Sequence, residues 1–543
     1  MKPKVMHPKD EPTLWVDYPT GWAIDPTGYK AKIPAGRGRE KANLADVLTL
    51  AHQLELHRVV YCRVPETREG TRHWLYVDTP GWEPGQHWVE PPTGRFTKIQ
   101  DPAEITDKPY EMEVRTAVEW FPSDINPQQA RDAWNILWQT VEGLTQGSRS
   151  IGLMKTPGAT GANLWAASLP RNIELLDTPS DIREELHANT GQHHIDHFVS
   201  GGECDCGNCR PLVKPDEKGE LPGFYYVDGR FMYASVCKEL GVGGKRMTAE
   251  QARDIFWFQD KGRYQRAWYK VTARVPKGWR HLGILAAKKP DTMDWHYPNR
   301  PGATFTTWAD AAEIDLALTH EWGIDIQEGI LFKKARVMDT WASRLTSARE
   351  TIQRDPNLDP VVRKAATTAL RAILLFGIGA LYSRGRRIEK SAKTLYEVPE
   401  EYRHMAEQHG AYYVWKEPAR KNTAGSDRYW PELTAQVWGK ARARVLSTPT
   451  ASGIEQRGGA LAVDPTTLIG INGDAIYTTT LPEWSLPTGL GGGDDGKPGR
   501  LRLQGALPRT ITAPLTSDDR NELRRRAERE GTGLIYGQAR NNQ

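Results

Sequence analysis

Runs of β-favouring residues alternate with helical patterns along the whole chain. Strand-like runs lie at 57–62, 73–77, 266–275, 280–287 and 324–332. Apolar residues recur at helical spacing at 45–56, 125–146, 308–321, 335–353, 360–381, 430–446 and 516–530. Both periodicities in one chain predict an α+β protein. The helical patterns at 335–353 and 360–381 are separated only by the turn RDPNLD, which predicts an antiparallel helical hairpin.

Two aspartates occupy positions that are well placed for chemistry. The segment GFYYVDGRFMYASVCKELG predicts a strand ending near Asp228 and a helix after it. The segment ALAVDPTTLIGINGDAIYTTT predicts a β-hairpin that turns near Asn472, Gly473 and Asp474. Taken singly, an aspartate in such a place is most often a turn or cap residue. Adjacent strands of one sheet would bring the two carboxylates together.

Composition restricts the possible classes of protein. A length of 543 residues predicts three or four compact units. The 72 basic and 68 acidic side chains nearly cancel, so any nucleic-acid surface must be local. The longest apolar run, Ala369 to Tyr382, is interrupted by Arg371 and is shorter than a membrane span requires. No apolar stretch follows the basic start, so we expect a cytoplasmic protein without a membrane.

Three of the five cysteines crowd into one polar, turn-rich stretch at 200–223, which predicts a linker or surface module. Cys204, Cys206 and Cys209 follow His193, His194 and His197 closely, and this set suffices for a structural zinc site closed by one histidine, His197. A reduced cysteine loop without metal and a redox role are the alternatives. Another glycine-rich stretch, at 488–499, predicts a linker before the arginine-rich C-terminal helix.

The two aspartate segments resemble motifs A and C of family B DNA polymerases. Motif A has the form Asp-x-x-Ser-Leu-Tyr-Pro-Ser at a strand-to-helix junction, and this chain reads Asp228-Gly-Arg-Phe-Met-Tyr233-Ala-Ser235. Motif C is a hairpin turn Asp-Thr-Asp-Ser, in which Asn472 replaces the first aspartate and Asp474 keeps the second. The resemblance implies that Asp228 and Asp474 are the catalytic pair and ligate two Mg²⁺ ions.

The helix at 360–381 carries a weaker resemblance to motif B, Lys-x-x-x-Asn-Ser-x-Tyr-Gly. Only Arg371, in place of the lysine, and Gly379 match, while Leu375 and Ile378 replace polar groups. Arg371 would grip the triphosphate, unless it merely extends from an apolar helix to solvent. Tyr233, with Phe231 and Met232, would bind the incoming nucleotide and exclude a 2′-hydroxyl; the alternative for Tyr233 is an ordinary core position.

The resemblance covers roughly 220–480 and implies a right-hand polymerase: an antiparallel-sheet palm, helical-hairpin fingers and a small thumb. We expect an N-terminal α+β domain at 1–124, a helical linker with the Cys/His cluster at 125–215, palm at 216–334 and 386–487, fingers at 335–385 and a thumb-like segment at 488–543. The expected partners are primer-template DNA and deoxynucleoside triphosphates, with a priming protein as a further candidate. Candidate DNA contacts are Arg384, Arg386, Arg387, Lys497 and Arg500.

A second arginine cluster, Arg520 to Arg526, is either a phosphate contact or a solvated helix face. Proofreading exonucleases of the family begin with Asp-x-Glu on a strand, and neither Asp17 nor Asp25 has the paired glutamate. We therefore expect no proofreading, with an N-terminal part that is a degenerate exonuclease or an unrelated fold. The predicted function is template-directed DNA synthesis; the alternative is a catalytically impaired DNA-binding protein that retains the scaffold.

Overall fold

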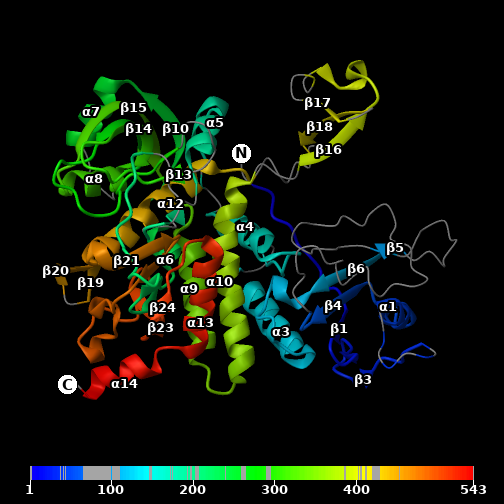
Figure 1. Ribbon diagram of the computed structural model, residues 1–543. Helices are drawn as coiled ribbons and strands as arrows, with labels where there is room; N and C mark the ends of the chain where they lie inside the picture. Colours follow the sequence, from blue (N-terminus) through cyan, green and yellow to red (C-terminus); the bar gives the residue numbers. More distant parts are fainter. Residues whose placement is uncertain are drawn as a thin grey trace. The chain divides into compact units, whose positions relative to one another are not determined.

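The structure is a computed structural model of the 543-residue chain (Figure 1). It describes residues 3–541 except 37, 39, 41, 43, 65–98, 101–110, 146–149, 171–172, 174, 192–193, 196–198, 202–206, 239, 259–264, 289–294, 384–386, 401–402, 404–405, 410–411, 419–427 and 452. The chain forms two compact units, which are described separately. The first unit contains 169–342 and 381–543, and the second contains 3–168 and 343–380.

The second unit is built on a sheet with the strand order β3-β2-β1-β4-β6-β5. Its strands are Thr13–Asp17 (β1), Trp22–Ile24 (β2), Lys30–Lys32 (β3), Arg58–Cys62 (β4), Ile99–Gln100 (β5) and Glu111–Thr116 (β6). Strand β4 runs parallel to both β1 and β6. The predicted strand at 57–62 is thus confirmed as β4, whereas the one predicted at 73–77 lies outside the described residues.

The two faces of this sheet differ in chemistry. Alternate residues Leu14, Val16 and Val59 pack with Leu44 and Leu48 of α1 (Leu44–Gln53) in an apolar core. Helix α3 (Pro127–Gly143), which begins with a capping box at Asn126, packs against β1, β2 and β4. Between α3 and the sheet lie aromatic and charged side chains.

The predicted helical hairpin is confirmed as α9 (Asp339–Arg354) and α10 (Pro360–Tyr382). Helix α4 (Pro157–Ser168) approaches α10 so closely that a Cβ atom at Gly161 would lie 2.1 Å from the carbonyl oxygen of Ile373. Among the described residues, α10 is a helix that is long and apolar enough to cross a membrane, whereas the apolar run in the sequence was too short to predict a span. Buried core helices pass the same test, and 56% of its apolar window is buried.

The first unit contains a five-stranded antiparallel sheet with the order β23-β9-β22-β21-β7. Its strands are His194–Ile195 (β7), Phe224–Gly229 (β9), Leu468–Asn472 (β21), Ala475–Thr478 (β22) and Leu501–Leu507 (β23). Helix α13 (Ser517–Glu530) packs on β9 and β23, where Leu523 and Ala527 join the core of Phe224, Tyr226 and Tyr477. The strand predicted to end near Asp228 and the hairpin predicted at 460–480 are both confirmed.

A second antiparallel sheet in this unit has the order β10-β15-β11-β14. Its strands are Gly241–Met247 (β10), Ala267–Arg274 (β11), Thr304–Asp310 (β14) and Gly323–Lys334 (β15), and the helices beside it are α5 (Ser180–Asn189), α7 (Ala249–Phe258), α8 (Ala311–Thr319) and α12 (Pro431–Leu446). Figure 1 shows α7 and α8 beside these strands. The long, mostly buried α12 packs against α5, α8, β10 and β14.

Three segments differ from the sequence predictions. Residues 280–286 are not a strand. Leu282, Ile284 and Leu285 are fully buried, but they pair with no neighbouring strand. In this run, only Ala287–Lys288 (β12) forms strand pairs, and its partner is Trp295–His296 (β13). The stretch 488–499 is a folded loop in which Asp494 is buried. Three strands with no strand prediction in the sequence form a separate sheet: β16 (Arg387–Ala392), β17 (Glu407–His409) and β18 (Tyr412–Pro418).

Candidate active site

Asp228 and Asp474 lie on neighbouring strands of the five-stranded sheet. Asp228 on β9 pairs in register with Ala475, the first residue of β22. Asp474 directly precedes Ala475, in the two-residue loop that joins β21 to β22. The backbone N–H of Gly229 donates to the carbonyl oxygen of Asp474 at 3.1 Å. The fold therefore brings together two aspartates from distant parts of the sequence.

A close approach at Gly229 fixes where the carboxylate of Asp474 lies. A Cβ atom at position 229 would lie 2.8 Å from Asp474 Oδ2 and 2.8 Å from Met232 Cβ. Only glycine, which has no Cβ atom, permits this close approach of Asp474 and Met232. The Asp474 carboxylate thus lies against the backbone of the residue after Asp228. Asp228 itself is 3% exposed, and Asp474 is partly exposed.

The turn after β9 brings Tyr233 to the same loop. Phe231 has φ 46°, in the left-handed region that residues other than glycine rarely adopt, and the short helix α6 (Met232–Val236) starts after it. The side chains of Phe231, Met232 and Tyr233 are all buried. A Cβ atom at Gly473 would lie 3.4 Å from the Tyr233 hydroxyl, so this side chain reaches the loop that carries Asp474.

Arginines hold the surrounding backbone in place. Arg230 donates three hydrogen bonds of 2.7–3.0 Å to the carboxylate of Asp494, which explains why the 488–499 stretch is folded. Arg444 of α12 donates to the hydroxyl of Ser235 at 2.6 Å. The first contact anchors the backbone just before α6, and the second anchors α6 itself.

The predicted DNA contacts of the C-terminal part have different environments. The side chain of Lys497 is 75% exposed and lies 3.2 Å from Asp495. Arg500 donates to Asp495 at 3.0 and 3.2 Å and to the carbonyl oxygen of Pro449 at 2.5 Å. Hydrogen bonds from Arg500 lower the pKa of Asp495. Lys497 is therefore the more accessible of the two cations.

The other predicted cations lie elsewhere or are not described. Arg371 lies half-buried on α10, in the second unit. Arg387 begins β16, whereas Arg384 and Arg386 lie outside the described residues. In α13, Arg520 is buried over the ring of Tyr477 at 5.3 Å, and Arg524 lies 5.4 Å from the ring of Tyr226. These two arginines anchor α13 to the sheet, whereas the side chain of Arg525, in the same cluster, is 59% exposed and lies 3.2 Å from Glu522.

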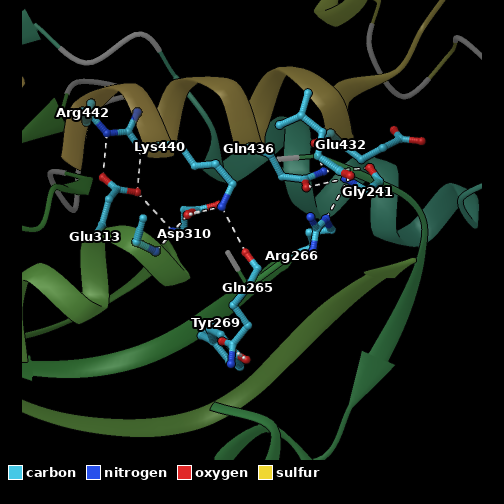
Figure 2. Close-up of polar contacts among 12 residues, drawn as sticks. Gly241, Gln265, Arg266, Tyr269, Asp310, Glu313, Glu432, Gln436, Lys440 and Arg442 are labelled. Atoms are coloured by element: carbon cyan, nitrogen blue, oxygen red, sulfur yellow. Dashed lines mark hydrogen bonds and ion pairs between the residues drawn. The ribbon is translucent and has the colours of Figure 1, made fainter. Parts of the chain in front are cut away.

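A buried polar layer lies beneath α12, and the sequence patterns did not reveal it. Glu432, Gln436 and Lys440 recur every four residues and project from one side of the helix (Figure 2). Lys440 Nζ donates to the carbonyl oxygen of Gln265 at 3.0 Å and lies 3.4 Å from Asp310 Oδ1. Burial raises the pKa of Asp310 to about 6, although Lys440 acts in the opposite direction.

Four further hydrogen bonds complete this layer. Arg442 donates to both carboxylate oxygens of Glu313, at 2.7 and 3.0 Å. The side-chain amide of Gln436 bonds the N–H and the carbonyl of Gly241, both at 2.9 Å. Arg442, Gln436 and Lys440 thus tie α12 to α8 and to β10, and they hold the helix that carries Arg444.

Cys209 is the described member of the predicted zinc site. Its Sγ atom lies 3.8 Å from His296 Nδ1 and 3.3 Å from the carbonyl oxygen of Tyr297. Sulfur and nitrogen ligands of one tetrahedral zinc ion are separated by roughly 3.6 Å, from bond lengths of roughly 2.3 and 2.1 Å. His296 is a neighbour that the sequence did not indicate, because it lies 87 residues away. Cys204, Cys206 and His197 lie outside the described residues.

The described residues contain no group of three or more His, Cys, Asp or Glu side chains that could hold a metal ion. Magnesium at nucleotide sites takes one or two protein carboxylates and completes its shell with water and phosphate oxygens. Asp228 and Asp474 supply that number of carboxylates. At Gly229, the Asp474 carboxylate and Met232 already occupy the place where a Cβ atom would stand, so this carboxylate lies close to the main chain after Asp228. Asp228 and Asp474 are therefore the described residues that could hold such an ion.

Asp17, the first candidate for a nuclease carboxylate, already has a cationic partner. Arg63 donates to its two oxygens at 2.7 and 2.6 Å, and the Thr20 hydroxyl donates as well. Burial raises the pKa of Asp17, but the hydrogen bonds from Arg63 and Thr20 outweigh this and lower it overall. Asp25 accepts hydrogen bonds from Thr27 and from the N–H of Tyr29.

Comparisons with known proteins give a match in structure and none in sequence. No family model matches the chain, and no curated protein matches it. Among solved structures, the chain is similar to phi29 DNA polymerase complexed with primer-template DNA and incoming nucleotides, with 10% identity over 92% of this chain and 86% of that one, at a TM-score of 0.49. The primer-template binary complex of the same polymerase gives 10% identity and a TM-score of 0.46, over 92% and 85% of the two chains. At these scores the likeness concerns the course of the chain and carries no conclusion about chemistry.

Proposed function

We propose that the chain is a template-directed DNA polymerase, with Asp228 and Asp474 as its catalytic carboxylates. The observation that carries this proposal is the contact of the Asp474 carboxylate with Gly229, directly after Asp228. When bound there, two Mg²⁺ ions would neutralise charge on the triphosphate and activate the primer hydroxyl for in-line attack on the α-phosphate. The residues of the chain orient the reactants around this pair.

Tyr233 is the residue best placed to meet the nucleotide sugar. Its hydroxyl lies at the loop that precedes Asp474, and its ring is fixed by the buried α6. A rigid ring at this point would exclude a 2′-hydroxyl by contact. Phe231 and Met232 are buried, so they would meet a triphosphate through backbone N–H groups. Arg371 would supply the cation for the triphosphate.

The arrangement of subdomains belongs to the same proposal. The five-stranded sheet, to which the segment from 488 contributes β23, would be the palm, and α9 and α10 the fingers. The rest of the segment from 488 would be a small thumb that contacts the primer through Lys497 and Arg500. Arg384, Arg386 and Arg387 would contact the template strand. Primer-template DNA, deoxynucleotides and a priming protein are the proposed partners, zinc is proposed at Cys209, and a cytoplasmic location is proposed for the chain.

We further infer that the second unit does not proofread. Metal-dependent nucleases require carboxylates that are free to bind the ions. Asp17 is neutralised by Arg63, and position 19 of the Asp-x-Glu pattern is a proline. The chain should therefore extend a mismatched primer, or stall on it, without shortening it.

Primer extension with labelled deoxynucleotides tests the activity. The full chain should extend a primer in Mg²⁺, stop when the metal is chelated, and incorporate deoxynucleotides in preference to ribonucleotides. Tyr233→Ala should relax this last preference. Binding of primer-template without any extension would instead establish the alternative, a DNA-binding protein that keeps the scaffold.

A further inference from the structure

Three arginines gather on the surface of the first unit, beside the loop that carries Cys209. Arg210, Arg280 and Arg300 come from three separate loops; Arg280 and Arg300 are exposed, and Arg210 is half-buried. Within the described part of the chain, no carboxylate forms an ion pair with any of them. We call this set the arginine patch. It contains none of the residues of the proposed active site and none of the DNA contacts predicted from the sequence.

Contacts with the backbone bring the three side chains to one place. Arg210 Nη2 donates to the carbonyl oxygen of Trp279 at 2.6 Å, directly before Arg280. Arg300 Nη2 lies 3.5 Å from the carbonyl oxygen of Cys209, directly before Arg210. The side chain of Arg210 therefore reaches the backbone beside Arg280, and the side chain of Arg300 reaches the backbone beside Arg210.

A buried asparagine locks two of the three loops together. Asn299 Oδ1 accepts a hydrogen bond from the N–H of Arg210 at 2.7 Å, and Asn299 Nδ2 donates to the carbonyl oxygen of Arg210 at 3.2 Å. The N–H groups of Asn299 and Arg300 both donate to the carbonyl oxygen of Asn208 at 3.0 Å. Because these loops are already ordered, a ligand of the patch would not need to order them on binding.

The third loop is also anchored. The ring of Trp279 packs edge-on against that of the buried Trp322, with the ring centres 5.6 Å apart. Next to Arg280, the imidazole of His281 donates to the carbonyl oxygen of Val463 at 2.8 Å. The backbone on both sides of Arg280 is thus fixed, and the arginine side chain extends from a rigid base.

The charges of the patch favour an anion. Burial and the positive charges of Arg280 and Arg300 lower the pKa of the Arg210 guanidinium, and no carboxylate acts in the opposite direction. An anion bound among the three cations would replace their mutual repulsion by attraction. The planar guanidinium group donates to two oxygens at once, which suits phosphate.

We propose that the arginine patch binds the phosphate backbone of a DNA strand outside the proposed active site. This inference rests on the proposed function, which makes DNA the polyanion that the chain meets. Each strand of a duplex presents one phosphate about every 3.4 Å along the helix axis, so cations on adjacent loops can contact successive phosphates.

The salt dependence of primer-template binding by the full chain tests the proposal. The variant Arg280→Gln/Arg300→Gln changes two exposed side chains and leaves the contacts of Arg210 and Asn299 intact. Loss of two phosphate contacts should reduce the slope of log affinity against log salt by about 1.8 and weaken binding at least about tenfold at 0.1 M salt. Thermal unfolding of the variant should match that of the parent.

Arg253→Gln/Arg354→Gln is the matched control, because these two exposed arginines already lie 3.1 Å from Asp325 and 3.7 Å from Glu350. The control should keep the parental slope and affinity. An unchanged slope and affinity in Arg280→Gln/Arg300→Gln would overturn the proposal. Loss of polyglutamate binding in that variant, with DNA binding unchanged, would assign the patch to an acidic protein instead.

The binding measurement requires no catalysis, so it separates this inference from the proposed function. A chain that binds DNA through the patch but extends no primer would refute the polymerase activity and leave the patch in place. A chain that extends primers and binds DNA without using Arg280 and Arg300 would refute the patch alone.

Discussion

Replacing Gly229 with alanine should disable the proposed active site without unfolding the protein. The added Cβ atom would lie 2.8 Å from Met232 Cβ and 2.8 Å from Asp474 Oδ2. Since non-bonded carbon atoms rest at roughly 3.5 Å, α6 or the 473–474 loop must move by about 0.7 Å. A displacement of this size at a catalytic group lowers rates by about 100-fold, while such crowding costs about 1–3 kcal/mol of stability.

Single-turnover primer extension and thermal unfolding measure the two effects separately. Gly278→Ala is the matched control, because a Cβ atom there meets nothing within 4 Å, and it should keep the parental rate and stability. Gly229→Ala should bind primer-template as the parent does and extend it about 100-fold more slowly. A folded Gly229→Ala protein that extends primers within about threefold of the parental rate would refute the role assigned to this contact.

Three further predictions concern stability and metal binding. Lys440→Met leaves Asp310 buried without its cation and should lower the free energy of unfolding by about 3–5 kcal/mol. Chemical denaturation measures this loss, and the control Lys364→Met should keep the parental free energy of unfolding. The pKa of Asp310 rises from 3.8 to about 6 on folding, so the native state binds this proton more tightly than the unfolded chain does. The resulting stabilisation is complete below pH 3.8 and is lost as the pH rises to 6. The free energy of unfolding of the parent, relative to that of Asp310→Asn, should therefore fall by about 3 kcal/mol over this range. The purified chain should contain about one zinc ion by elemental analysis. Cys209→Ser and His296→Ala should each lose this ion. Zinc retained in both variants would exclude Cys209 and His296 as its ligands.

The elements around the two aspartates could be predicted because local patterns and tertiary structure agree there. The FYYV run favours a strand, and the Gly-Asp loop, with Gly473 at φ 62°, suits a two-residue hairpin. Motif spacing also singles out Asp228 and Asp474, which lie on neighbouring strands, and their catalytic role stays a prediction. The contact that places Asp474 over Gly229 could not, because it depends on how two distant strands pair.

Other features follow from tertiary contacts that have no local signal. The apolar run at 280–287 reads as a strand, yet most of it is a buried, bent segment, and only Ala287–Lys288 pairs with another strand. The glycine-rich stretch at 488–499 reads as a linker, yet the ion pair of Arg230 with Asp494 folds it. Likewise, the neighbour of Cys209 is His296 from the distant strand β13, and Arg520 and Arg524 of α13 stack on Tyr477 and Tyr226.

The most direct test of the proposed chemistry compares Asp228→Asn and Asp474→Asn with the parent in primer extension under Mg²⁺. Each substitution keeps the size of the side chain and removes the charge that a metal ion requires. Asp325→Asn, at an exposed surface carboxylate, is the control and should extend normally. Both site variants should melt like the parent, bind primer-template, and lose extension by at least about 1,000-fold. Extension at the parental rate by either variant would contradict the assignment of Asp228 and Asp474 as the catalytic pair.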